Sequence, residues 1–211
     1  MKFNARHEPG NGLVTVTGSD NCDTDSWPLV PEIVFRQYQG SYDPETVAIA
    51  STILFSRHCG SVAEFNGAKV GIDAARAVRA IVPDAEDILP IDGMRREIGQ
   101  GVASLVVGEA ERILCDGIPV GRIGRSARAV TWSGDFVSPA RRESTHYIGG
   151  SVFTNARLVA ASTNISVALA LLIGGRALRD IYVPAPADDE AADFERIAAG
   201  LEFISIKLRA L

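Results

Sequence analysis

Alternation of apolar and polar residues marks several strands along the chain. The segments 13–17 and 62–70 both alternate, and Asn66-Gly67 interrupts the second. Because both residues of an Asn-Gly pair accept positive φ, this dipeptide predicts a hairpin. A second hairpin is predicted over 112–120, with Asp116-Gly117 at its tip. These local pairings predict a mainly antiparallel sheet.

Two helices are predicted from their end signals. The segment 43–59 opens with Asp43-Pro44-Glu45, which supplies an N-cap, a proline at the first helical position and an acid in the first turn. Gly60 follows this segment and is predicted to take the left-handed C′ position. The second helix covers 74–82 and is stopped by Pro83.

Two more helices are predicted in the C-terminal part. The apolar stretch 152–173 carries a narrow polar stripe, and its portion 158–175 has no charge. That portion is at the lower length limit for a membrane span, but several hydroxyl and amide side chains interrupt it, so we predict a buried core helix. The fourth helix covers 188–199 and is expected to stop at Gly200.

The order of these elements predicts an α+β fold over one domain, residues 1–211. Its sheet is expected to be mainly antiparallel and to be packed by about four helices, because hairpins outnumber βαβ units. An α/β fold is the alternative. No internal repeat is visible in the sequence.

Composition and charge indicate which cellular compartment and which binding partners to expect. The net charge is −5, which argues against a surface built as a nucleic-acid platform. The mean hydropathy of +0.11 favours a homo-oligomer. Three widely spaced cysteines and an N-terminus without an apolar signal core predict a cytoplasmic protein with neither disulfides nor a membrane segment.

Two motifs contain residue types that often act in catalysis or metal binding, but a structural role is the better interpretation of both. His58 and Cys59 are adjacent on the predicted helix, so their side chains diverge, and the negative end of the helix dipole disfavours a thiolate there. The loop 21–25 together with Glu32 has the oxygen spacing of a calcium-binding loop. Ser26 stands where that loop needs glycine, so an Asx-rich turn is the interpretation, and no metal site is predicted.

An arginine-rich stretch carries the clearest binding signal. The segment 112–142 contains six arginines and only two acidic residues, which gives a local excess of four positive charges in a chain that is acidic overall. Arginine beside glycine suits phosphate or carboxylate, because the guanidinium offers a fork of donors and glycine lets backbone N–H groups approach. The alternative is a solvated strand face that pairs with the acids of 188–195. The predicted ligand-binding residues are Arg122, Arg125, Arg128 and Arg141.

The segment 134–150 is predicted to be a loop, and it carries the candidate residues for acid–base chemistry. His146 is the predicted proton carrier, and Asp135 is predicted to orient its ring. Ser144, Ser151 and Cys115 are the nucleophiles that the sequence offers to this pair. An ordinary polar loop is the alternative.

These features predict an enzyme or enzyme-like subunit that binds a small anionic ligand, such as a nucleotide, a phosphate ester or a carboxylate. The alternative is a non-catalytic subunit whose basic stretch contacts an acidic protein or a nucleic-acid backbone. A regulatory ligand-binding module is a third hypothesis. Whether the chain is catalytic, and with which cofactor, is left open by the sequence.

Overall fold

The described residues of the chain form both helices and strands. The computed structural model describes residues 1–20, 22–28, 30–36, 43–67, 69–94, 98–99, 103–108, 114–115, 118–119, 127–133, 147–148, 152–154, 156 and 160–210. Its α-helices are α1 (Pro44–Phe55), α2 (Ile72–Ile81), α3 (Ser162–Gly174) and α4 (Ala191–Glu202). The predicted α+β class with four helices is confirmed for these residues. The single-domain organisation stays a prediction.

The strands are numbered along the chain. They are β1 (Lys2–Glu8), β2 (Leu13–Ser19), β3 (Glu32–Arg36), β4 (Val62–Asn66), β5 (Val70–Gly71), β6 (Asp87–Leu89), β7 (Ile91–Asp92), β8 (Ala103–Gly108), β9 (Leu114–Cys115), β10 (Ile118–Pro119), β11 (Ala127–Ser133), β12 (Tyr147–Ile148), β13 (Val152–Thr154), β14 (Leu178–Val183) and β15 (Lys207–Ala210). Short 3₁₀ turns are η1 (Pro9–Asn11), η3 (Gly175–Ala177) and η4 (Asp188–Glu190).

The main sheet is mixed, so the prediction of a mainly antiparallel sheet was wrong. Its eleven strands run in the order β15-β14-β8-β11-β13-β3-β2-β1-β4-β6, and β12 pairs with β11. The central pairs from β8 to β1 are antiparallel. The outer pairs β1–β4, β4–β6, β8–β14 and β14–β15 are parallel, because a helix crosses between successive outer strands.

The hairpin predicted at Asn66-Gly67 does not form. Gly67 does take a positive φ of 78°. However, β4 pairs in parallel with β1 and β6, and β5 pairs in parallel with β7 in a separate small sheet. The turn therefore leads the chain out of the sheet toward α2. Strands β9 and β10 pair antiparallel on either side of 116–117, in keeping with the second predicted hairpin.

The same order of elements occurs twice. Apart from short additional strands, the order in the first half is β1, β2, β3, α1, β4, α2 and β6. The order in the second half is β8, β11, β13, α3, β14, α4 and β15. In each half the first strand pairs antiparallel with the second and parallel with the fourth. The equivalent strands β3 and β13 join the halves through antiparallel pairs. The topology thus repeats although no sequence repeat is visible.

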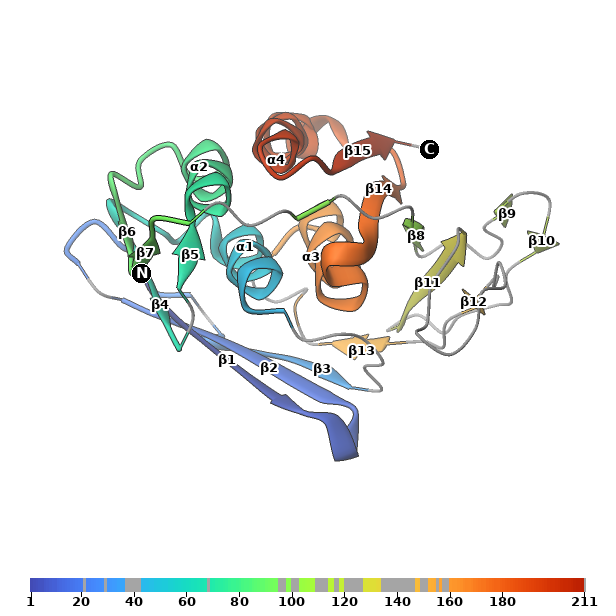
Figure 1. Cartoon of the computed structure of the whole chain (residues 1–211), viewed down its shortest axis with the longest axis horizontal. Helices are drawn as coiled ribbons and strands as arrows, with labels where there is room; N and C mark the ends of the chain where they lie inside the picture. Colours follow the sequence, from blue (N-terminus) through green and yellow to red (C-terminus); the bar gives the residue numbers. More distant parts are fainter. Residues whose placement is uncertain are drawn as a thin grey trace.

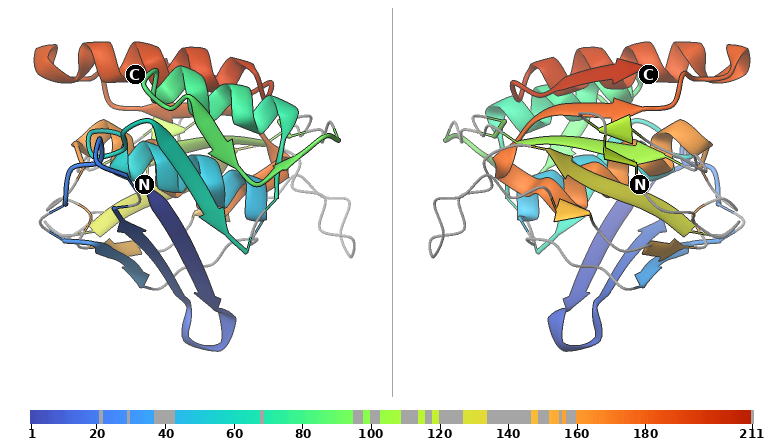
Figure 2. Two further views of the ribbon diagram at one scale, coloured as in Figure 1. Left: turned by 90° about the vertical axis from the view of Figure 1, so that its left-hand side faces the viewer. Right: turned by 90° about the vertical axis from the view of Figure 1, so that its right-hand side faces the viewer.

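Helices α1 and α3 form the centre of the molecule. The sheet curves around them, and α2 and α4 pack together across the open side (Figures 1 and 2). Both central helices are buried on all sides, as expected of a helix that is surrounded by protein. Ile49, Ile53, Ile165 and Leu169 are fully buried there. The core helix predicted over 152–173 is α3 from residue 162 onward, whereas Val152–Thr154 forms strand β13, so the predicted start of this helix was wrong.

The two central helices run antiparallel. Asn164, near the start of α3, donates from Nδ2 to the carbonyl oxygen of Ile53 near the end of α1, over 3.2 Å. At the other end Arg176, just after α3, contacts Asp43 at the N-cap of α1 through a 2.8 Å Nε–Oδ1 bond. Both ends of α1 are therefore held by residues at the two ends of α3, which fixes the position of the residues that follow α1.

Candidate functional site

Two loops that the sequence presents as unrelated meet at the C-terminal end of α1. The loop 22–26 lies against the turn 57–61. The Asp25 carboxylate accepts from the Gly60 N–H over 2.7 Å, and it also contacts the α-amino group of Met1 at 2.7 Å. The Thr24 hydroxyl oxygen accepts from the Ser61 N–H over 2.8 Å. These contacts fix the two loops as one unit.

Gly60 makes this close approach of the loops possible. A Cβ atom at this position would collide with the Thr24 hydroxyl and with the Thr24 backbone carbonyl. Gly60 is not among the glycines with positive φ, so the predicted left-handed C′ role was wrong. The glycine is instead needed for space, because the loop 22–26 passes directly over it.

Ser26 and His58 form a hydroxyl–imidazole pair between the two loops. The Ser26 Oγ–His58 Nδ1 distance is 2.9 Å. The Ser26 N–H also donates to the His58 carbonyl oxygen over 3.0 Å, which holds the two backbones together. Partial burial, and then the charge of Arg57, lower the pKa of His58. The imidazole is therefore neutral near pH 7 and can accept a proton.

The two thiols at this junction differ in character. The Cys22 Sγ lies 3.1 Å from the Thr24 Oγ1 and 3.7 Å from the Ser61 Oγ. The hydrogen bond with Thr24 is the largest of the contacts that lower the pKa of Cys22. Burial raises the pKa of Cys59 to about 11. Cys59 is thus a packing residue, as the sequence predicts, whereas the Cys22 thiolate is accessible at milder pH.

An open hollow of about 570 Å³ lies beside the Ser26–His58 pair. The turn after α2 provides its third wall. The lining residues are Thr24, Ser26, Arg57, His58, Cys59, Gly60, Ser61, Pro83, Asp84 and Glu86. The volume falls within the range of small-molecule sites.

The charged residues that line this hollow are negative on balance. Arg57 is the cationic lining residue, and its Nε and Nη2 atoms lie 3.1 and 2.9 Å from Asp193 Oδ2 on α4. Asp84 and Glu86 contribute two carboxylates. The C-terminal ends of α1 and α2 also point their negative dipole ends toward these turns. A ligand that carries a net negative charge is therefore not favoured in this hollow.

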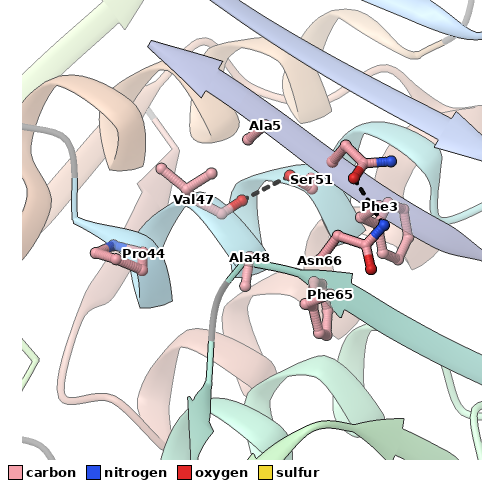
Figure 3. A pocket seen from close by; sticks show the side chains of 9 residues that line it. Phe3, Ala5, Pro44, Val47, Ala48, Ser51, Phe65 and Asn66 are labelled. Atoms are coloured by element: carbon pink, nitrogen blue, oxygen red, sulfur yellow. Dashed lines mark hydrogen bonds between the residues drawn. The ribbon is translucent and has the colours of Figure 1, made fainter.

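A second, smaller hollow lies between α1 and the strands β1 and β4 (Figure 3). Its volume is only about 10 Å³, and its walls are mostly apolar side chains such as Phe3, Val47 and Phe65. Its polar groups are paired among themselves: Ser51 donates to the Val47 carbonyl, and Asn66 donates to Asn4. The space holds about one water molecule, and the polar side chains named here already have hydrogen-bond partners, so we interpret it as a packing gap.

Only one of the catalytic and ligand-binding residues predicted from the sequence is among the described residues. His146, Asp135, Arg122, Arg125 and Arg141 lie outside the described residues. Arg128 lies on β11, where its backbone pairs with Val152 of β13. The catalytic pair and the arginine clamp therefore stay predictions.

The sequence treats Ser26, His58 and Cys22 as parts of two separate motifs and assigns each motif a structural role. Their convergence depends on the path of the chain through β3 and α1, which no local pattern specifies. The turn signals in 21–28 and the polar end of the first predicted helix were the available hints.

The loop with calcium-like spacing has another role. Both Asp25 oxygens accept from nitrogen donors, including the N–H groups of Gly60 and Cys22. Among the described residues no three His, Cys, Asp or Glu side chains are grouped closely enough to hold a metal ion.

Comparisons with known protein families, with curated proteins and with solved structures found no match to this chain. In the described part of the chain, none of the helices has the length and apolar character needed to cross a bilayer.

Proposed function

We propose that the hollow beside Ser26 and His58 is the active site of an enzyme that transfers or hydrolyses an acyl group of a small ester or amide. The observation that carries the proposal is the 2.9 Å contact between the Ser26 hydroxyl and the His58 imidazole at the wall of this hollow. A nucleophile within hydrogen-bond reach of a base is the arrangement that activates serine.

The chemistry follows from the positions of the two side chains. With His58 protonated on Nε2, its Nδ1 accepts the Ser26 proton while Ser26 Oγ bonds to the substrate carbonyl carbon. The bond from that carbon to the leaving group breaks, and the leaving group takes the proton from Nδ1. Water then attacks the acyl carbon and gives its proton to His58 Nδ1. The bond from that carbon to Ser26 Oγ breaks, Oγ takes the proton from Nδ1, and the carboxylic acid is released. Arg57 can face the oxyanion that develops in both steps.

Labelling with a fluorophosphonate tests this proposal, because the reagent reacts with activated serines. We expect mass spectrometry to find the adduct on Ser26, and we expect labelling to disappear in Ser26→Ala and to fall at least 100-fold in His58→Gln. Ser19→Ala is the matched control, since the Ser19 hydroxyl bonds to the Lys2 carbonyl outside the hollow. An unlabelled protein, or an adduct that persists in Ser26→Ala, contradicts the proposal. A panel of nitrophenyl esters then reports turnover.

The arginine-rich stretch supports a second proposal, the binding of a small anionic ligand such as a nucleotide, a phosphate ester or a carboxylate. Its support is the local excess of positive charge, with Arg122, Arg125, Arg128 and Arg141 as the binding residues. Thermal-shift measurements with phosphate, nucleotides and citrate test this proposal: a rise with one of them that is lost in Arg125→Gln supports it. A steep salt dependence with nucleic acid would favour the non-catalytic subunit instead.

We also propose that the protein works in the cytoplasm and as a homo-oligomer. The two cysteines whose side chains are described, Cys22 and Cys59, are unpaired thiols, as a reducing compartment maintains. Large exposed apolar side chains, including Trp27 and Met94, favour association. Light scattering at several concentrations tests the second point.

A further inference from the structure

The guanidinium of Arg57 is held by a residue from the opposite half of the chain. Both Nε and Nη2 bond to the same oxygen of Asp193, at 3.1 and 2.9 Å. Asp193 lies in the first turn of α4, 136 positions later in the sequence, and only 10% of its side chain is exposed. Half of the Arg57 side chain, by contrast, is exposed at the hollow.

The Asp193 carboxylate is itself fixed on its other side. Its Oδ1 bonds to Arg196, one turn further along α4. The carboxylate also lies in the first turn of α4, at the positive end of the helix dipole. Asp193 is therefore a rigid, nearly buried acceptor, and the arginine that it binds loses most of its rotamer freedom.

The contact leaves one edge of Arg57 for a ligand. Nε and Nη2 are engaged by Asp193, whereas none of the described residues accepts a hydrogen bond from Nη1. A guanidinium carries five N–H donors in a fixed plane, so fixing one edge also fixes the direction of the other. Without Asp193 the side chain would sample many rotamers and the donors would point in no fixed direction.

We infer that Asp193 is a positioning residue for catalysis: it orients Arg57 so that the Nη1 edge can bind the oxyanion in the hollow. This inference rests on the proposed acyl-transfer function. It makes α4 part of the site, although α4 contributes no residue to the lining of the hollow, and it explains a nearly buried acid whose two oxygens are both taken by arginines.

A double-mutant cycle on fluorophosphonate labelling tests the inference. We expect Arg57→Gln to lower the maximal labelling rate about 100-fold, the usual loss of one oxyanion donor. Asp193→Asn should lower the same rate about 10-fold and leave the half-saturating concentration nearly unchanged. In the Arg57→Gln background, Asp193→Asn should have almost no further effect, because Asp193 acts through Arg57.

Asp180→Asn is the matched control: it removes another nearly buried acid that bonds to two arginines, Arg179 and Arg209, away from the hollow, and it should label at close to the wild-type rate. Arg196→Gln removes the second partner of Asp193 and keeps the Arg57 contact, so it should lower the labelling rate less than Asp193→Asn does. A loss in Asp193→Asn that is equally large in the Arg57→Gln background shows a general structural effect and overturns the inference.

The ¹⁵Nε–¹H resonance of Arg57 gives a readout that does not depend on labelling. It should be protected from solvent exchange in the wild type and in Arg196→Gln, and it should lose protection in Asp193→Asn. Lost protection without a change in labelling overturns the inference while the proposed function stands. Unlabelled wild-type protein overturns the proposed function, and a protected resonance then still shows that Asp193 orients Arg57. An unprotected wild-type resonance overturns the inference whatever the labelling.

Discussion

Ser26 and His58 are 32 positions apart in the chain, yet they share two hydrogen bonds, one between side chains at 2.9 Å and one between backbones at 3.0 Å. The backbone bond fixes the separation of the two Cα positions, so the side-chain bond does not depend on chance contact between exposed rotamers. Asp25, directly before Ser26, is tied to Gly60 in the same way. The pair is therefore preorganised by the loops that carry it.

The first prediction concerns the pH dependence of Ser26 reactivity. The pKa of His58 is lowered from its ordinary value of 6.5 by burial and by Arg57. Protonated imidazole cannot take the serine proton, so the labelling rate should fall on acidification with its half-maximal point below pH 6.5. A rate–pH profile with fluorophosphonate measures this. A half-maximal point above pH 7 would show that another group acts as the base.

The same shift predicts how His58 affects stability. Because its folded pKa lies below its unfolded pKa, the unfolded chain takes up a proton first on acidification, and stability falls as the pH drops through about 6.5. His58→Gln should flatten that part of the stability–pH curve. Urea unfolding at pH 5 and pH 7.5 of both proteins measures the difference, and an unchanged slope in the variant would contradict it. His7→Gln is the control, since His7 lies on β1 outside the lining of the hollow.

The second prediction distinguishes the two thiols. With a pKa of about 11, Cys59 is a thiolate in only about one molecule in a thousand at pH 8, and it is buried. Cys22 is partly exposed, and its pKa is lowered by the Thr24 hydroxyl. Iodoacetamide should therefore modify Cys22 much faster than Cys59 in the folded protein, as peptide mass spectrometry measures. Thr24→Val should slow the Cys22 reaction, and equal rates for both thiols in the wild type would contradict the assignment.

Local signals in the sequence predicted local structure well. Asp43 does cap α1, accepting from the Thr46 N–H over 3.0 Å, and Pro44 takes the first helical position. The uncharged stretch contains the buried helix α3, whose few polar side chains are small and are buried together with the apolar ones. These outcomes depend on residues a few positions apart, so propensity and periodicity are sufficient to predict them.

Long-range pairings were not predictable in the same way. Asn66-Gly67 makes a turn, but the strand before it pairs with β1 and β6, whose register depends on the whole sheet. Likewise, His58 and Cys59 were expected on the helix but lie beyond its end at Phe55, and Ser26 and Thr24 reach them from another loop. A hollow formed by three separate turns leaves no periodic signal in the sequence.

The third prediction concerns Gly200, which was expected to end a helix and instead lies inside α4. A Cβ there would be 2.9 Å from the Ala77 carbonyl oxygen and 2.7 Å from the Ile81 side chain, both on α2. Gly200→Ala should therefore destabilise the protein by about 1–3 kcal/mol, although alanine is the better helix former. Urea unfolding measures this. The control Gly10→Ala meets no atom within 4 Å and should change stability by less than about 0.5 kcal/mol. A stabilised Gly200→Ala variant would show that α2 and α4 are further apart.

The fourth prediction separates the two roles of Asp43. Its Oδ2 caps α1 and its Oδ1 bonds to Arg176 over 2.8 Å, so the residue links the start of α1 to the end of α3. Asparagine keeps a capping oxygen but loses the charge, whereas alanine loses both. Asp43→Asn should cost less than about 1 kcal/mol, since Arg176 is half exposed and its ion pair is screened by solvent. Asp43→Ala should cost at least about 1 kcal/mol more, through the lost cap. Urea unfolding of both variants measures the two contributions, and Arg176→Gln gives an upper bound for the ion pair, since it also removes the 3.7 Å contact of Arg176 with Glu45. If asparagine is as harmful as alanine, the ion pair outweighs the cap, and the α1–α3 contact is the more important role.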